Sequence, residues 1–132
     1  MTVSVLVVDD SGFFRKRLTE ILTASGQIKV IGAATNGREG VELAEKLRPD
    51  VITMDYEMPV MDGYQSTREI RLFEQSRDVD PCWIIALSAH AAGDYVQKAR
   101  DAGVDDYLSK PVSRSQVLEA LQRNRALSAG GN

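Results

Sequence analysis

The sequence lacks the features that would fasten the chain covalently or place it in a membrane. It has a single cysteine, Cys82, so an internal disulfide cannot form. No apolar run approaches the roughly 20 residues of a membrane-spanning helix, and no basic segment leads into an apolar stretch at the N-terminus. We therefore expect a cytoplasmic protein without membrane insertion, in which Cys82 is a structural, half-buried thiol.

An excess of positive charge is also missing. The 16 Lys and Arg residues are outnumbered by 19 Asp and Glu, which gives a net charge of -3 and argues against a nucleic-acid partner. The 43% apolar and 27% charged residues are typical of a globular domain, and 132 residues can bury roughly two thirds of the unfolded surface in one core. Because no repeat, linker or second domain is visible, we predict one domain over residues 1–125 and a flexible tail over 126–132.

Short β-branched segments alternate with segments of helical periodicity. The former predict strands at 4–8, 28–33, 51–54, 83–87 and 105–108, and each is followed by an amphipathic segment. This alternation is typical of βαβ units and predicts an α/β fold with a parallel sheet. The run at 51–54 is apolar on both faces, as a central parallel strand should be. Capping boxes are predicted where Asn36 precedes Glu39 and where Ser113 precedes Gln116.

Charged residues stand where these apolar runs end. Asp9 and Asp10 follow the first run, Asp55 and Glu57 follow the third, and Lys110 follows the fifth. The carboxyl ends of parallel strands share one edge of the sheet, where ligands bind in open α/β folds. The sequence therefore predicts one site built from all five residues.

Three carboxylates in one cleft cost free energy unless a cation or a shared proton offsets their charge. Mg²⁺ prefers oxygen ligands and is commonly held by one or two carboxylates with phosphate oxygens. We expect Asp10 and Asp55 to be direct ligands and Asp9 to act mainly through water. Glu57 is expected to offer its backbone carbonyl.

A carboxylate beside Mg²⁺ can attack phosphorus and form an aspartyl phosphate. Asp55 is the predicted nucleophile, and Lys110 would neutralise charge on the transferred group. Ser88, at the end of the fourth predicted strand, would add a hydroxyl donor. Taken singly, Asp10 is more simply a helix N-cap, Ser88 a turn residue and Lys110 a solvated loop lysine. Their joint position at strand ends favours the site.

Four motifs in this order carry a family resemblance. They are Val-Asp-Asp-Ser at 8–11, Met-Asp-Tyr-Glu-Met-Pro-Val-Met-Asp-Gly at 54–63, Leu-Ser-Ala at 87–89 and Ser-Lys-Pro at 109–111. Together they resemble the receiver domain of two-component response regulators over nearly the whole chain. The resemblance implies a flavodoxin-like (βα)5 fold with strand order 2-1-3-4-5.

The same resemblance implies a function. Asp55 would take a phosphoryl group from a histidine kinase or phosphotransfer domain, with Mg²⁺ held by Asp9, Asp10, Asp55 and the Glu57 carbonyl. Such a domain assists its own phosphorylation and dephosphorylation but turns over no other substrate, and it acts on a downstream output protein or domain. A cis peptide between Lys110 and Pro111 and a monomer or weak dimer are also expected.

Family behaviour implies a switch as well. On phosphorylation Ser88 would move toward the phosphoryl group and Tyr107 would rotate inward, which remodels the face of the fourth helix, fifth strand and fifth helix. This is a population shift, and it requires the phosphoryl group to contact the active state better than the inactive one.

The character of the sequence changes along the chain. Up to about Gly63 it resembles receivers of chemotaxis methylesterases, and from about Tyr64 it resembles receivers attached to hybrid sensor kinases. This change suggests a natural mosaic or an engineered chimeric receiver, joined near the loop after the third strand.

Two other classes of function compete with this interpretation. A phosphatase of the haloacid dehalogenase type also forms an aspartyl phosphate, but its second aspartate would fall at position 57, which is Glu57 here. A receiver fold that is never phosphorylated and serves only as an interaction module is the other alternative. A flavin site is disfavoured because the loop after the first strand is acidic where an anionic cofactor needs donors.

Overall fold

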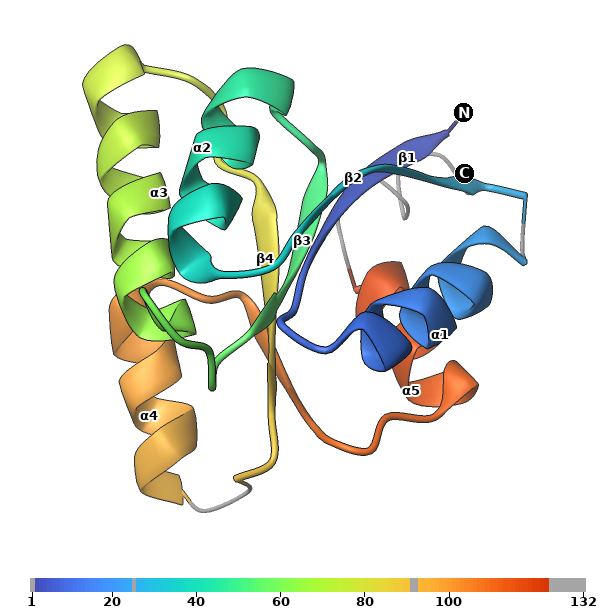
Figure 1. The fold of residues 1–132 in the computed structure, drawn as a ribbon. Coiled ribbons are helices and arrows are strands. Elements are labelled where there is room, and N and C mark those ends of the chain that lie inside the picture. Colours follow the sequence, from blue (N-terminus) through green and yellow to red (C-terminus); the bar gives the residue numbers. More distant parts are fainter. Residues whose placement is uncertain (1, 25, 91–92, 124–132) are drawn as a thin grey trace.

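A parallel five-stranded sheet lies between two layers of helices (Figure 1). The computed structural model describes residues 2–24, 26–90 and 93–123. The strands and helices in chain order are β1 (Val3–Val8), α1 (Gly12–Thr23), β2 (Ile28–Ala34), α2 (Gly37–Leu47), β3 (Val51–Asp55), α3 (Gly63–Arg77), β4 (Trp83–Ser88), α4 (Gly93–Ala102), β5 (Asp106–Ser109) and α5 (Arg114–Gln122).

The strand order is β2-β1-β3-β4-β5, and every neighbouring pair is parallel. This confirms the predicted flavodoxin-like topology, with element boundaries shifted by one or two residues. The predicted tail at 126–132 lies outside the described residues. Among the described helices, none combines the length and the apolar character that crossing a membrane requires.

Each face of the sheet carries its own hydrophobic core. Helices α1 and α5 cover one face, and α2, α3 and α4 cover the other (Figure 1). In β1, Val5 and Val7 face the first layer while Leu6 and Val8 face the second, because successive side chains of a strand point to opposite sides. All five residues of β3 are buried, which confirms the prediction of a central strand.

Side-chain caps begin the helices that flank the site. Ser113 and Gln116 form the predicted capping box at α5. At α2 the Asn36 side chain accepts from the Glu39 amide, but the Glu39 carboxylate accepts from the amide of Thr35 rather than from that of Asn36. The second predicted box is thus only half formed.

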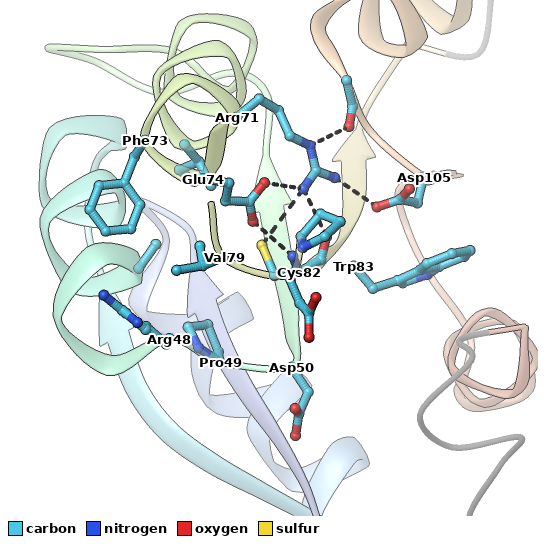
Figure 2. A pocket seen from close by; sticks show the side chains of 15 residues that line it. Arg48, Pro49, Asp50, Arg71, Phe73, Glu74, Val79, Cys82, Trp83 and Asp105 are labelled. Carbon is cyan, nitrogen blue, oxygen red and sulfur yellow. Dashed lines mark hydrogen bonds and ion pairs between the residues drawn. The ribbon is translucent and has the colours of Figure 1, made fainter. Parts of the chain in front are cut away.

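A half-buried arginine, Arg71, ties α3 to the amino edge of the sheet (Figure 2). The guanidinium of Arg71 lies 2.8 Å from carboxylate oxygens of both Glu74 and Asp105. It also donates to the backbone carbonyls of Cys82 and Gly103, at 2.8 and 2.9 Å. Cys82 directly precedes β4, and Gly103 and Asp105 precede β5. The Arg71 side chain therefore links α3 to the starts of both strands.

The two carboxylates of this network are bonded to the backbone as well. The amide of Cys82 donates to Glu74, and the amide of Ile84 donates to Asp105, at 2.7 and 2.9 Å. Burial raises the pKa of the Cys82 thiol, with a further contribution from the Glu74 charge, so the thiol stays protonated. This agrees with the predicted structural role of Cys82 and with the low reactivity of buried thiols.

Replacing Arg71 with Met should destabilise the protein by about 3 kcal/mol, because it leaves two partly buried carboxylates without their cation. Chemical denaturation at neutral pH measures the change in unfolding free energy. Arg77→Met on the same helix is the matched control, since Arg77 is exposed and only approaches the Phe73 ring. Equal, small losses in both variants would show that the Arg71 network contributes little.

Candidate functional site

The three predicted aspartates meet at the carboxyl edge of the central strands. Asp9 and Asp10 follow β1 and Asp55 ends β3, and these strands are neighbours in the sheet. One carboxylate oxygen from each residue lies within 4.8 Å of the other two. Asp9 and Asp55 are 1% and 2% exposed, whereas Asp10 faces solvent. The structure thus forms an acidic cluster with two buried members and one open side.

Lys110 supplies the counter-charge for the buried pair. Its ammonium nitrogen lies 3.0 Å from Asp9 Oδ2 and 3.3 Å from Asp55 Oδ1. The centre of the Phe14 ring, in the first turn of α1, lies 4.3 Å from the same nitrogen, so the two groups form a cation–π contact. The Lys110–Pro111 peptide bond is cis, as the family resemblance implied.

The electrostatics of this cluster are unbalanced. Burial, and then the neighbouring charge of Asp9, raise the pKa of Asp55 from an ordinary 3.8 to about 7, although Lys110 opposes the shift. For Lys110, burial lowers the pKa, but the hydrogen bond to Asp9 and the charges of Asp55 and Asp9 outweigh it and give a net rise. The lysine is therefore firmly charged, while Asp55 carries its negative charge at a cost that a further cation would relieve.

Ser88 lies at the end of β4, next to the Asp55 strand, as predicted. It is fully buried, and its hydroxyl donates to Glu57 Oε2 at 2.8 Å. The amide of Ala89 donates to the other oxygen of the same carboxylate, at 2.9 Å. The structure thus gives the Glu57 side chain a role at the site that sequence reasoning, which assigned only its backbone carbonyl, missed.

The register of the sheet explains the contact. Asp55 and Leu87 form the last paired position of β3 and β4, so the two chains leave the sheet side by side. Glu57 and Ala89 each lie two residues beyond this pair, and the Ala89 amide reaches the Glu57 carboxylate. The signal that would have found this contact is the register between the two strands.

Tyr107 bridges β5 and the loop after β4. Its hydroxyl donates to the backbone carbonyl of His90, and its ring packs half-buried against the core. The His90 ring stacks on Tyr95 of α4, with the ring centres 4.3 Å apart. The residue predicted to act in the switch therefore already contacts the segment that follows Ser88.

The loop that follows Asp55 is tightly built. The amide of Met61 donates to the carbonyl of Pro59 at 2.8 Å across Val60, whose φ is +70°, as in a γ-turn. A Cβ on Gly63 would stand 2.1 Å from the Tyr56 ring, so only glycine allows α3 to begin this close to the strand. This packing holds the segment between Asp55 and α3 in place.

A cavity of about 1040 Å³ lies at the opposite edge of the sheet, beside Arg71 (Figure 2). Of its charged lining residues, Arg71, Glu74 and Asp105 are engaged in the ion network described above. Among the residues that the structure describes, three carboxylates converge on one lysine at the acidic edge, which we take as the functional site.

Comparisons with known proteins agree with this choice. The family model described as "Response regulator receiver domain" matches residues 5–122. The chain belongs to the receiver domain family of response regulators. It therefore has the fold and the acidic pocket typical of domains that accept a phosphoryl group on an aspartate in a Mg²⁺-dependent reaction.

Among curated proteins, the receiver is 54% identical over 110 residues to protein-glutamate methylesterase/protein-glutamine glutaminase 1 of Pseudomonas aeruginosa. The match covers 83% of this chain but only 29% of that relative, so the chain spans less than a third of the methylesterase's length.

Two solved structures are similar over almost the whole chain. The response regulator domain of Thermotoga maritima CheB has a TM-score of 0.82 at 32% identity, covering 94% of this chain and 96% of its own. The receiver domain of the sensor histidine kinase PA1611 from Pseudomonas aeruginosa has a TM-score of 0.81 at 36% identity, covering 94% and 98%. The latter has a magnesium ion coordinated in its active-site cleft.

These relatives also bear on the suggested mosaic. A match that covers 110 of 132 residues has to include residues 23–110, and so it crosses Gly63, where the join was expected. One methylesterase thus aligns with the receiver on both sides of Gly63. Receivers of the two kinds are homologous and would align in this way in a mosaic as well, so the mosaic origin stays a prediction.

The raised pKa of Asp55 predicts how stability depends on pH without metal. The folded state binds this proton more tightly than the unfolded chain, so its stabilisation is complete below pH 3.8 and is lost as pH rises to about 7. With a chelator present, Asp55→Asn should gain stability over the unmodified protein as pH rises, by roughly 2–4 kcal/mol above pH 7. Denaturation at several pH values measures this difference. Asp80→Asn, at an exposed position, is the control, and a gain that does not depend on pH would contradict the assignment.

Proposed function

We propose that Asp55 is the residue of this receiver that accepts the phosphoryl group. A carboxylate oxygen of Asp55 attacks phosphorus, the bond from phosphorus to the donor's nitrogen or oxygen breaks, and its electron pair leaves with the donor. The observation that carries the proposal is the position of Asp55, buried beside Asp9 and in contact with the ammonium of Lys110, which also contacts Asp9. Lys110 is placed to neutralise charge on the transferred group.

The donor set fits a hard divalent cation. The oxygens of Asp9, Asp10 and Asp55 converge within 4.8 Å, and the exposure of Asp10 leaves the cluster open to solvent on one side. We assign Mg²⁺ to these carboxylates and to the backbone carbonyl of Glu57. When bound, the cation supplies positive charge toward the phosphoryl oxygens and favours the ionised form of Asp55.

The phosphoryl group would be supplied by a histidine kinase or a phosphotransfer domain. Ser88 and Tyr107 would transmit the change to the face formed by α4, β5 and α5, because both residues contact the loop between β4 and α4. The downstream partner is an output protein or domain, and the similarity to methylesterases makes such an enzyme the first candidate. In this proposal the receiver regulates and catalyses no turnover of its own, acts in the cytoplasm and is a monomer or weak dimer.

Incubation with Mg²⁺ and acetyl phosphate should add a single phosphoryl group to the intact protein, as measured by mass spectrometry. The adduct should be lost on treatment with hydroxylamine, which cleaves acyl phosphates but not phosphate esters of Ser or Thr. Asp55→Asn should abolish the addition.

Asp62→Asn is the matched control, since Asp62 lies in the same loop, where its side chain caps α3, and Asn is an equally good N-cap. Loss of the adduct only in the Asp55 variant supports the assignment. Absence of any adduct in the folded, unmodified protein would instead favour the interaction module.

Asp10→Asn should weaken Mg²⁺ binding by at least about tenfold, because it removes one of the clustered carboxylates while leaving the buried pair in place. Calorimetric titration with MgCl2 measures the affinity. Asp80→Asn, an exposed residue in the segment before β4 at the other edge of the sheet, should bind as tightly as the unmodified protein. Unchanged affinity in the Asp10 variant would remove Asp10 from the ligand set.

A further inference from the structure

The Glu57 carboxylate holds two hydrogen-bond donors that stand beside the phosphorylation site. It accepts from the hydroxyl of Ser88 at 2.8 Å and from the amide of Ala89 at 2.9 Å, one on each oxygen. We propose that this carboxylate is an internal competitor of the phosphoryl group: it occupies the donors that the group needs and has to leave before Ser88 can switch. The proposal rests on the function proposed for Asp55.

The donors cannot serve both groups at once. A hydroxyl has one proton to donate, and the Ser88 oxygen already accepts from the amide of His90 at 3.0 Å. The single Ser88 proton is therefore committed to Glu57, as is the single proton of the Ala89 amide. A phosphoryl group on Asp55 can take these protons only if the carboxylate releases them.

The sheet brings the competing groups to one place. Asp55 pairs with Leu87, and the amide of Tyr56 donates to the Leu87 carbonyl at 2.9 Å. Ser88 and Ala89 are the next two residues on that strand end. The amide of Glu57 donates to Asp55 Oδ1 at 3.1 Å, so the competitor is joined to the phosphoacceptor through a two-residue turn.

Charge and exposure make the carboxylate displaceable. An acyl phosphate carries nearly two negative charges at neutral pH and so repels a neighbouring carboxylate while attracting its donors. Glu57 is exposed, and its side chain can turn into water at little cost. Asp9, by contrast, is buried and bonded to Lys110, so it cannot move aside in this way. Glu57 is thus a positioning residue that keeps Ser88 and Ala89 in the unphosphorylated arrangement.

Three variants separate the hydrogen bonds of Glu57 from its charge. Glu57→Ala removes both, and Glu57→Gln removes the charge but keeps an acceptor. Glu57→Asp keeps the charge but withdraws the carboxylate by one methylene, which should take its oxygens out of hydrogen-bond distance of the Ser88 hydroxyl and the Ala89 amide. The first readout is hydrogen exchange of the Ala89 amide, followed by NMR with neither metal nor phosphodonor present. The second readout is the affinity for beryllofluoride, a tetrahedral analogue of the phosphoryl group, measured with Mg²⁺.

Exchange at Ala89 should accelerate in the Ala and Asp variants and less in the Gln variant. Both the Ala and the Asp variants should bind beryllofluoride about three- to tenfold more tightly than the unmodified protein, the range given by one hydrogen bond of ordinary net strength. The Asp variant distinguishes the two explanations. If the charge of Glu57 alone opposed the phosphoryl group, this variant would bind beryllofluoride no more tightly than the unmodified protein.

Unchanged exchange at Ala89 in the Ala variant would overturn the proposal, as would an Asp variant that binds beryllofluoride no more tightly than the unmodified protein. These failures leave Asp55 as phosphoacceptor, because the unmodified protein still binds the analogue. Failure of every variant to bind beryllofluoride, with the fold intact, would overturn the proposed function and the competition together.

Discussion

The burial of two like charges side by side is the constraint on which the rest of this structure depends. Asp9 and Asp55 are almost completely removed from solvent at the ends of adjacent strands, and the ammonium of Lys110 contacts both. Carboxylates in such surroundings repel one another strongly, since the interior screens charge less than water does. Their proximity is maintained because the strands that carry them are fixed by two hydrophobic cores. Packing thus holds an arrangement that electrostatics alone would disperse.

Charged side chains are balanced at the amino edge of the sheet and unbalanced at the carboxyl edge. At the amino edge, Arg71 and two carboxylates are paired with each other and with backbone groups, so each charge has a partner (Figure 2). At the carboxyl edge, three carboxylates share one lysine. A balanced network contributes to the fold, whereas an unbalanced one has affinity for a further cation. The contrast explains why the acidic edge, rather than the cavity beside Arg71, is the functional site.

A chain of short contacts leads from the acidic edge toward α4 and β5. Glu57 bonds to Ser88 and Ala89, the amide of Lys110 donates to the Ser88 carbonyl at 2.7 Å, and Tyr107 donates to His90. In the proposed switch, a change in the partner of the Ser88 hydroxyl would therefore alter a segment that is also bonded to β5. Energetic coupling of this kind needs an element with two arrangements, and in this proposal the segment from Ser88 to His90 is that element.

Much of the fold followed from pattern alone. Alternation of β-branched and helical segments predicted five parallel strands, the family resemblance implied their order, and the charged residues that end β1, β3 and β5 were found at one edge. These features are local, because the periodicity of a strand and the position of a residue after it can be recognised from neighbouring residues of the sequence.

Tertiary structure decided which polar groups pair with one another. The Glu39 carboxylate bonds to Thr35 rather than completing the capping box, and the Glu57 carboxylate bonds to Ser88 and Ala89. The latter contact depends on the register of β3 against β4, which joins residues some 30 positions apart. The sequence by itself determined the fold, the edge of the sheet that carries the site and the chemical groups available there. The register and packing of strands that are distant along the chain decided which acceptor each hydrogen-bond donor of the site contacts.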